Sequence, residues 1–167
     1  MKSLVAAPGV SELVAPSQSE DGFDIGASVL TVTMKDFLAQ PHSYFTECFG
    51  PTALLVLCES DTDFADAIAY LEGALVATIQ AVPESDHDLV RRLALSLSAL
   101  AGRIVVNMWP TGLAVSPWQH HGGPYPASTS PLHTSVGLQA MMRFVRPVVL
   151  QNASEDDWPG LVGAWEN

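Results

Sequence analysis

Three short apolar runs in the middle of the chain predict buried strands. They lie at 53–58, 75–80 and 104–107, and each is nearly continuous and bounded by Gly, Pro or polar residues. Runs of this length without an alternating polar face are typical of strands that are covered on both sides.

Apolar side chains at helical spacing fill the two intervals between these runs. The first interval predicts a helix around 64–71 that Gly73 ends, and the second predicts a helix over 86–101 that Gly102 ends. Strands that alternate with helices of this length are joined by parallel crossovers, so the pattern predicts part of an α/β sheet.

The segments before this region carry weaker patterns. Residues 1–27 contain scattered Pro and Gly and predict a short helical segment followed by a loop. Residues 28–33 are rich in Val and Thr and predict a further strand, while 34–39 predict a turn of helix that Pro41 ends.

The segments after the last apolar run predict a long loop and an edge strand. Residues 108–134 are rich in Pro and Gly, and a loop of this length in a compact domain is more often functional than idle. A short helix over 136–143 and a strand over 145–151 follow. Pro147 places that strand at a sheet edge, where an apolar strand can pair with another chain, so we expect an oligomer contact there.

The composition suggests a surface for a binding partner and argues against nucleic acid as a ligand. Apolar residues make up 48% against 15% charged, and the mean hydropathy of +0.23 suggests that part of the surface is meant for a partner. The net charge of −11 argues against binding to nucleic acid, which requires clustered Lys and Arg.

The charge is also distributed unevenly. Residues 91–154 hold five Arg and neither Asp nor Glu, whereas all 18 acids lie elsewhere. Such a stretch could receive an anionic substrate or cofactor, or its Arg side chains could end helices and pair with the acidic part of the chain. The sequence leaves both interpretations open.

Targeting signals and disulfides are not predicted. The apolar stretch near the N-terminus is broken by Pro8-Gly9, and no run approaches the roughly 18 residues that a membrane span requires. Cys48 and Cys58 are separated by an extended segment and cannot reach each other, so we predict no bridge between them. These features predict a cytoplasmic protein.

The stretch Glu47-Cys48-Phe49-Gly50-Pro51 sets a carboxylate, an aromatic ring and a Gly-Pro turn just before an apolar strand. A carboxylate can accept both hydroxyls of a vicinal diol, and an aromatic face can pack against a planar ring. Taken alone, the pattern fits equally an exposed acid beside a core aromatic.

A second group of motifs follows in the long loop. It comprises Trp109-Pro110-Thr111-Gly112 and the segment His121-Gly122-Gly123-Pro124-Tyr125-Pro126-Ala127. Together with the Glu47 motif, these residues make the chain resemble the C-terminal part of the NAD(P)-dependent aldehyde dehydrogenases. Within that family the chain is most similar to the ketoglutarate-semialdehyde (2,5-dioxovalerate) dehydrogenases.

The resemblance implies a role for each motif. Glu47 would bind the hydroxyls of the ribose that carries the nicotinamide of NADP or NAD, and Phe49 would lie beside the nicotinamide ring. Trp109, Trp118, His120 and His121 would border the substrate tunnel, where the aromatics could enclose a short aliphatic aldehyde. The alternative is that this loop only covers the sheet.

The resemblance also implies what the chain lacks. In the family a Cys thiolate attacks the aldehyde, hydride passes to the nicotinamide, and an activated water cleaves the thioester. No residue here matches that nucleophile or general base, and Cys48 occupies the variable position of the cofactor motif, so we assign no catalytic residue. We also predict no metal site, because the neighbouring His120 and His121 would point to opposite sides of an extended backbone.

These expectations define an organisation and a function. We expect a partial aldehyde dehydrogenase catalytic domain over 28–143, preceded by an N-terminal remnant and loop over 1–27 and followed by an oligomerisation strand and tail over 144–167. The expected function is a C-terminal fragment of an enzyme that oxidises a small semialdehyde acid, inactive alone. Its partner would be another copy or the missing N-terminal half, bound through 145–151. The alternative is a stand-alone interaction protein that associates with a full-length dehydrogenase.

Overall fold

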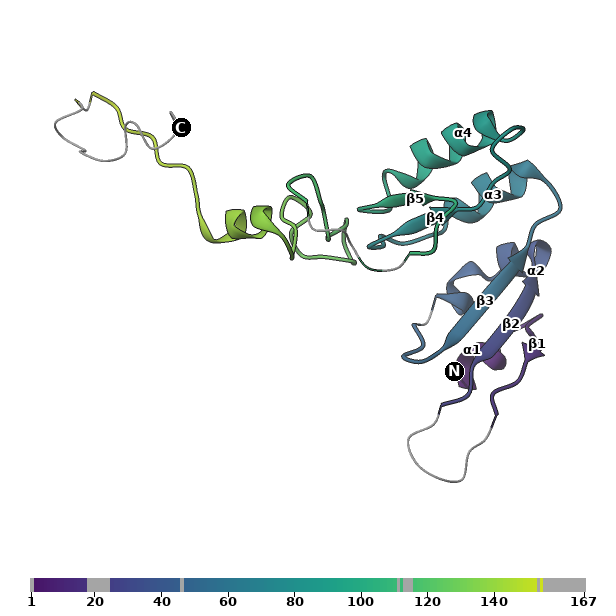
Figure 1. Cartoon of the computed structure of the whole chain (residues 1–167). Helices are drawn as coiled ribbons and strands as arrows, with labels where there is room; N and C mark the ends of the chain where they lie inside the picture. The colour runs from purple at the N-terminus through teal and green to yellow at the C-terminus, as the bar shows by residue number, and fades with distance from the viewer. Residues whose placement is uncertain are drawn as a thin grey trace.

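The computed structural model describes residues 2–17, 25–45, 47–110, 112, 116–152 and 154. Figure 1 shows two groups of strands with their helices, and beyond β5 a long segment that extends away from both. The elements, in chain order, are α1 Lys2–Val5, β1 Ser11–Val14, β2 Ser28–Thr33, α2 Met34–Ala39, the 3₁₀ helix η1 Pro41–Tyr44, β3 Thr52–Leu57, α3 Asp61–Ile68, β4 Ala77–Ile79, α4 His87–Leu97, β5 Ile104–Val106 and the 3₁₀ helix η2 Leu138–Phe144.

The first sheet has the order β1-β2-β3. β1 is antiparallel to β2, whereas β2 and β3 are parallel and paired from Ser28 opposite Thr52 to Thr33 opposite Leu57. Side chains alternate across a strand, so Leu30 and Val32 point to the same face of β2, and both are buried.

The core lies on this face of the first sheet. Its buried members come from α1, β2, α2 and η1, and they are Leu4, Leu30, Val32, Met34, Phe37 and Tyr44. The hydroxyl of Tyr44 donates to the carbonyl of Pro8 at 2.6 Å, which ties the N-terminal turn to η1. Burial, with Asp36 nearby, raises the pKa of Tyr44.

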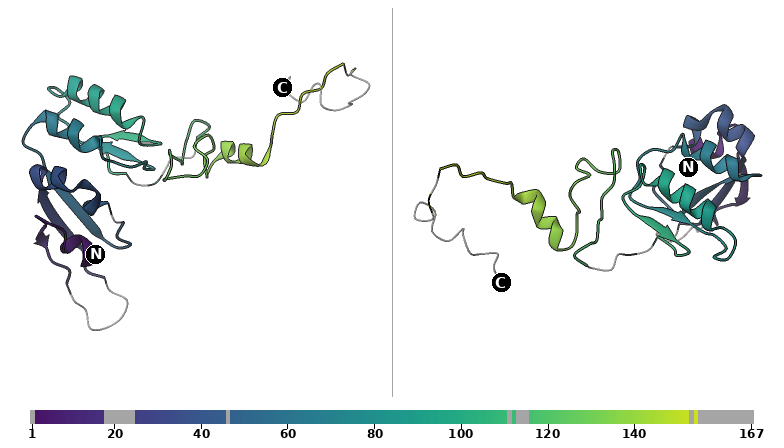
Figure 2. Two further views of the ribbon diagram at one scale, coloured as in Figure 1. Left: turned by 180° about the vertical axis from the view of Figure 1, so that it is seen from behind. Right: turned by 90° about the horizontal axis from the view of Figure 1, so that it is seen from above.

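The second group of strands is the parallel pair β4-β5, which a bridge between Ala74 and Ala101 extends. Figure 2 shows α3 and α4 lying together against this pair. The apolar face of α4 points inward, with Leu97 buried and Leu89 and Leu93 half-buried.

The prediction of parallel strands joined by helices is confirmed, because β2 and β3 form one parallel pair and β4 and β5 another. The helices and strands predicted between residues 28 and 107 lie within a few residues of their predicted positions. In the described part of the chain, however, the strands form two separate ladders and not one continuous sheet.

Two local predictions were wrong. Residues 11–14 were expected in a loop, but they form β1, a strand of four residues that exists because it pairs with β2. Residues 145–151 were expected to form a strand, but they belong to none of the described strands, and their side chains are exposed. A strand needs a neighbour for its backbone groups, and no described strand pairs with this segment.

Much apolar surface is exposed. The accessible area of the chain is 12754 Å², whereas a compact monomer of this mass exposes about 8,000 Å².

No helix in the described ranges is long and apolar enough to cross a membrane.

Candidate functional site

The loop before β3 presents two of the predicted site residues to solvent. Glu47 is exposed, and Phe49 is 95% exposed, so its ring is not part of the core. The loop is fixed at its C-terminal end, because the Thr52 amide donates to the carbonyl of Gly50 at 2.8 Å and the Ser28 amide donates to the carbonyl of Pro51 at 2.9 Å. A carboxylate and an aromatic ring therefore stand accessible, two residues apart, on a loop that is tied to the sheet.

A second candidate site is a hollow of about 530 Å³ in the loop after β5. Trp118 and His120, two of the predicted tunnel residues, both line it. The remaining lining residues are Pro117, Gln119, Leu132, His133, Thr134, Gln139 and Met142. The hollow therefore combines aromatic and aliphatic side chains with two imidazoles and two carboxamides.

Thr134 connects the two sides of this loop. It is 3% exposed, and its hydroxyl accepts from the His121 amide at 2.8 Å and donates to the carbonyl of Val136 at 3.1 Å. Ser135 adds a second link, because its amide donates to the carbonyl of His121 at 3.0 Å. The ring of His121 is engaged as well, with Nδ1 at 2.8 Å from the Ser135 hydroxyl.

Close backbone contacts attach the loop to the start of the β4-β5 ladder. A Cβ at Gly102 would overlap the carbonyl of Gly122, and one at Gly123 would overlap the carbonyl of Ala74. A Cβ at Gly73 would likewise overlap the carbonyl of Tyr125. Only glycine permits such an approach, so these positions hold the loop against the strands.

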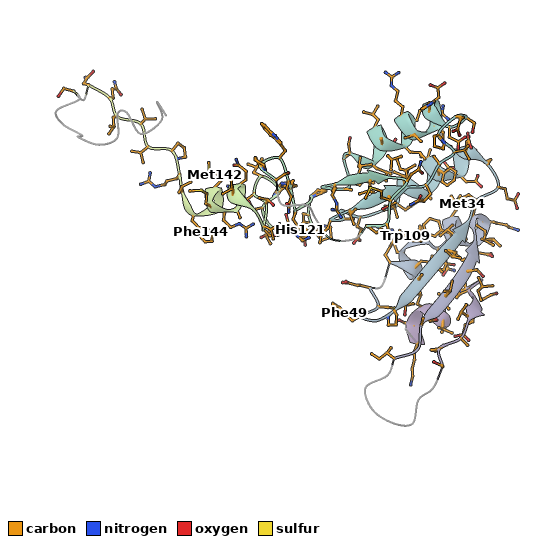
Figure 3. All side chains as sticks on the ribbon, viewed as in Figure 1. Met34, Phe49, Trp109, His121, Met142 and Phe144 are labelled. Carbon is orange, nitrogen blue, oxygen red and sulfur yellow. The ribbon has the colours of Figure 1, made fainter. Side chains whose placement is uncertain are left out.

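The structure places the predicted site residues in separate regions. Trp118 and His120 share the hollow, His121 is turned toward Ser135, and Trp109 is 79% exposed and does not line the hollow. Figure 3 shows Phe49 on the loop before β3 and His121 beyond β5, apart from each other. No motif in the sequence singles out Gln119, His133 and Gln139, which sequence reasoning did not identify and which the folding of the loop brings to the hollow.

Gln119 is the least satisfied polar group of the hollow. Both of its amide atoms are buried without a hydrogen-bond partner. His133, by contrast, has its Nδ1 at 2.8 Å from the Ser130 hydroxyl. An amide offers a donor and an acceptor side by side, so Gln119 can bind a ligand group that has both or either.

None of the residues that line the hollow carries a carboxylate. Residues 91–154 hold neither Asp nor Glu, and the Arg92 of this stretch pairs with Asp61 at 3.7 Å on the exposed face of α3 and α4. Within the described ranges, no three His, Cys, Asp or Glu side chains lie where they could hold a metal ion together. The amides and imidazoles of the lining can form hydrogen bonds to a neutral or anionic polar group.

Cys48 and Cys58 are the two cysteines of the chain. They form no disulfide, and burial, with Asp63 nearby, raises the pKa of the Cys58 thiol. A raised pKa keeps a thiol protonated and poorly nucleophilic.

Comparison with known proteins gives a consistent result at the level of sequence. No protein-family model matches the chain. The alpha-ketoglutaric semialdehyde dehydrogenase 2 of Azospirillum brasilense is 40% identical over 156 residues, which are 93% of this chain and 29% of that protein. The alpha-ketoglutaric semialdehyde dehydrogenase of Acinetobacter baylyi is 40% identical over 109 residues, which are 65% of this chain and 20% of that protein. The chain thus spans less than a third of the length of these curated relatives.

Solved structures agree on the fold. The Delta-pyrroline-5-carboxylate dehydrogenase from Mycobacterium tuberculosis, in a crystal structure bound with NAD, is similar with a TM-score of 0.52 and 24% identity, over 78% of this chain and 23% of that one. A second crystal structure of the same enzyme gives a TM-score of 0.51 and 25% identity, over 69% of this chain and 21% of that one. The fold is therefore part of a larger α/β fold.

Proposed function

We propose, from the premise that this chain belongs to the aldehyde dehydrogenase family, that it forms the C-terminal part of the catalytic domain of an NAD(P)-dependent enzyme. The proposed reaction is oxidation of a small semialdehyde acid to a carboxylate. The observation that carries this proposal is the 40% identity to an alpha-ketoglutaric semialdehyde dehydrogenase over 93% of the chain. The matched segment takes in 156 of the 167 residues and therefore spans both candidate sites.

The loop before β3 supports the cofactor half of the proposal. Glu47 would bind the ribose hydroxyls and Phe49 would pack beside the nicotinamide, and both side chains are exposed and unobstructed. NAD(P), when bound, would accept the hydride of the aldehyde. The proposed cofactor is NADP or NAD, and a protein of similar fold has been crystallised with NAD bound.

The hollow after β5 supports the substrate half. Its aromatic and aliphatic walls suit a short carbon chain, and its amides and imidazoles, with no carboxylate nearby in sequence, suit an acid group. In this proposal Trp118 and His120 contact the substrate. His121 positions the loop through Ser135, and Trp109 borders the entrance.

A chimera tests the proposal directly. The 156 matched residues of the Azospirillum brasilense relative are replaced by this chain, and aldehyde-dependent NAD(P)H formation is measured with 2,5-dioxovalerate. We expect turnover by the chimera, with the unmodified relative as the positive control. A chimera that folds and assembles like the relative but shows no turnover would contradict the proposal.

We further propose that the chain is inactive by itself, because neither a nucleophile nor a general base matches the family pattern. The same assay on the isolated chain should give no NAD(P)H above a buffer control. Measurable turnover would disprove this part of the proposal.

A second candidate function is a stand-alone protein that associates with a full-length dehydrogenase through 145–151. The exposed side chains of that segment and the large accessible area favour it. Mixing the chain with the intact Azospirillum brasilense relative distinguishes the two functions. A change in the mass or activity of the relative supports association, and no change in either counts against it.

A further inference from the structure

Asn107 continues the β4-β5 ladder with its side chain. The Ala77 amide donates to the carbonyl of Arg103 at 2.9 Å, and further along the ladder the Asn107 amide donates to the carbonyl of Ile79 at 2.9 Å. Bonds in a parallel ladder are evenly spaced, so the next bond would join the Ala81 amide to the carbonyl of Asn107. The Ala81 amide instead donates to the side-chain Oδ1 of Asn107 at 2.8 Å. The side chain of Asn107 therefore takes the place of its own carbonyl.

Because the side chain supplies the acceptor, the main chain of Asn107 can turn away from the ladder. Its φ is +53°, in the left-handed region that residues other than glycine seldom adopt. Asn tolerates this region better than most residues, since its short amide can bond to nearby backbone groups. The ladder thus keeps its bond to Ala81, while the main chain leaves the direction of β5 at Asn107.

Two further restraints act on the residues that follow Asn107. The side-chain Nε2 of Gln80 donates to the carbonyl of Met108 at 3.1 Å. Trp109 precedes Pro110, and a residue before proline is limited to extended backbone. The main chain over 107–109 is therefore restrained at three successive residues.

Trp109 depends on these restraints for its position. Its side chain is 79% exposed, so packing against the core does not hold it. The direction of an exposed side chain follows from the backbone that carries it, because the allowed rotamers depend on φ and ψ. A change of backbone conformation at Asn107 or Met108 would therefore move the indole.

We propose that Asn107 and Gln80 are positioning residues, which hold the main chain so that the indole of Trp109 forms one wall of the substrate entrance. This inference rests on the proposed function, in which Trp109 borders that entrance. An indole packs against the aliphatic chain of an aldehyde and makes no bond to the reacting carbonyl. The two positioning residues therefore act on the binding of aldehydes with an aliphatic chain, and they leave the binding of NAD(P) and the chemical step unchanged.

Amide exchange in the isolated chain tests whether the side chain of Asn107 holds Ala81. Asn107→Gly keeps the left-handed backbone but loses Oδ1, so the Ala81 amide should exchange at least about tenfold faster. Asn107→Asp keeps an acceptor oxygen and tolerates the same backbone, so exchange should remain as in the wild type. Asn152→Gly is the matched control, because Asn152 also has a positive φ of +59° and lies outside the ladder. Equal exchange of Ala81 in all these variants would overturn the inference.

A double-mutant cycle in the chimera tests whether Asn107 acts through Trp109. Asn107→Gly and Trp109→Ala should each raise the KM for 2,5-dioxovalerate about tenfold, with kcat and the KM for NAD(P) unchanged within about twofold. The double variant should have the same KM as Trp109→Ala, because without the indole Asn107 has nothing to position. Asn107→Asp should keep the wild-type KM. Effects that multiply in the double variant, or an unchanged KM in both single variants, would overturn the inference.

Gln80→Met tests the second positioning residue. Methionine has a similar length but cannot donate to the Met108 carbonyl, so the KM for the aldehyde should rise about threefold. Gln40→Met, the same substitution at another exposed glutamine, is the control. Equal KM values in the two variants would overturn the part of the inference that concerns Gln80.

The unmodified chimera separates this inference from the proposed function. A chimera without turnover would contradict the proposed function and, with it, the role of Trp109 at the entrance. Turnover by the chimera, with an aldehyde KM that Asn107→Gly leaves unchanged, would overturn this inference alone.

Discussion

Gly102 and Gly122 touch backbone to backbone, since a side-chain carbon at Gly102 would overlap the carbonyl oxygen of Gly122. Gly102 ends the turn after α4, and Gly122 belongs to the loop that forms the hollow. This contact joins a regular element to a segment without periodic structure. It explains how a loop rich in Pro and Gly keeps a fixed position beside the β4-β5 ladder.

Gly102→Ala should release this loop. The added methyl group cannot fit beside the Gly122 carbonyl, so the loop must move, and the bond from the His121 amide to Thr134 should weaken. We expect the His121 amide to exchange at least about tenfold faster. Gly112→Ala is the control, because a Cβ there meets no atom within 4 Å. Equal exchange rates in both variants would contradict the role of the contact.

Thr134→Val should destabilise the same loop through a different group. Valine keeps the shape of threonine but loses the hydroxyl that accepts from the His121 amide, which leaves a half-buried N–H without its partner. The cost is about 1–3 kcal/mol in the free energy of unfolding, measured by denaturant titration. Thr129→Val, the same substitution at an exposed position of this loop, should change it by less than about 0.5 kcal/mol. A Thr134→Val variant as stable as wild type would show that the hydroxyl bond adds nothing to stability.

Leu30→Ala should lower the free energy of unfolding more than Leu95→Ala does. Leu30 is 0% exposed in the centre of the first core, so truncation leaves a cavity that costs about 2–5 kcal/mol. Leu95, 76% exposed on α4, serves as the control for the same substitution. Circular dichroism during denaturation measures both. Similar losses at the two positions would mean that the core described around β2 does not form.

Acid should destabilise the segments around α3 and α4. The Glu59 amide and the Ser60 hydroxyl lower the pKa of Asp63, and the Val82 amide and the Ser85 hydroxyl lower that of Asp86. A pKa that is lower in the folded state stabilises that state above the ordinary Asp value of about 3.9. The contribution is lost as the pH falls from there through the folded-state pKa.

The double variant Asp63→Asn, Asp86→Asn tests this pH dependence. Amides do not titrate in this range, so the free energy of unfolding of the variant should depend less on pH below about pH 4 than that of the wild type. Denaturant titrations at a series of pH values measure the difference. Parallel pH curves for the two proteins would contradict the prediction.

Glu47→Gln should weaken cofactor binding in the chimera described above. An amide replaces one acceptor oxygen of the carboxylate by a donor, so the pair of hydroxyls that Glu47 is proposed to bind loses a charged partner. We expect the KM for NAD(P) to rise about tenfold or more. Glu72→Gln, another exposed acid of the same chain, is the control. An unchanged KM for NAD(P) in Glu47→Gln would remove Glu47 from the cofactor site.

The sequence alone determined the local elements and the family resemblance. Short apolar runs and helical spacing predicted β3, β4, β5, α3 and α4, because burial imposes a period on the residues themselves. The Glu47 motif and the His121 segment pointed to the family to which the curated relatives belong.

The tertiary structure alone decided which strands pair and which side chains of the long loop meet. β1 exists because β2 lies beside it, and 145–151 is no strand because no described strand pairs with it. Gln119 and His133 meet in one hollow only after the glycine contacts have set the path of the loop. Backbone pairing and close approach join residues far apart in sequence, and no local period records them.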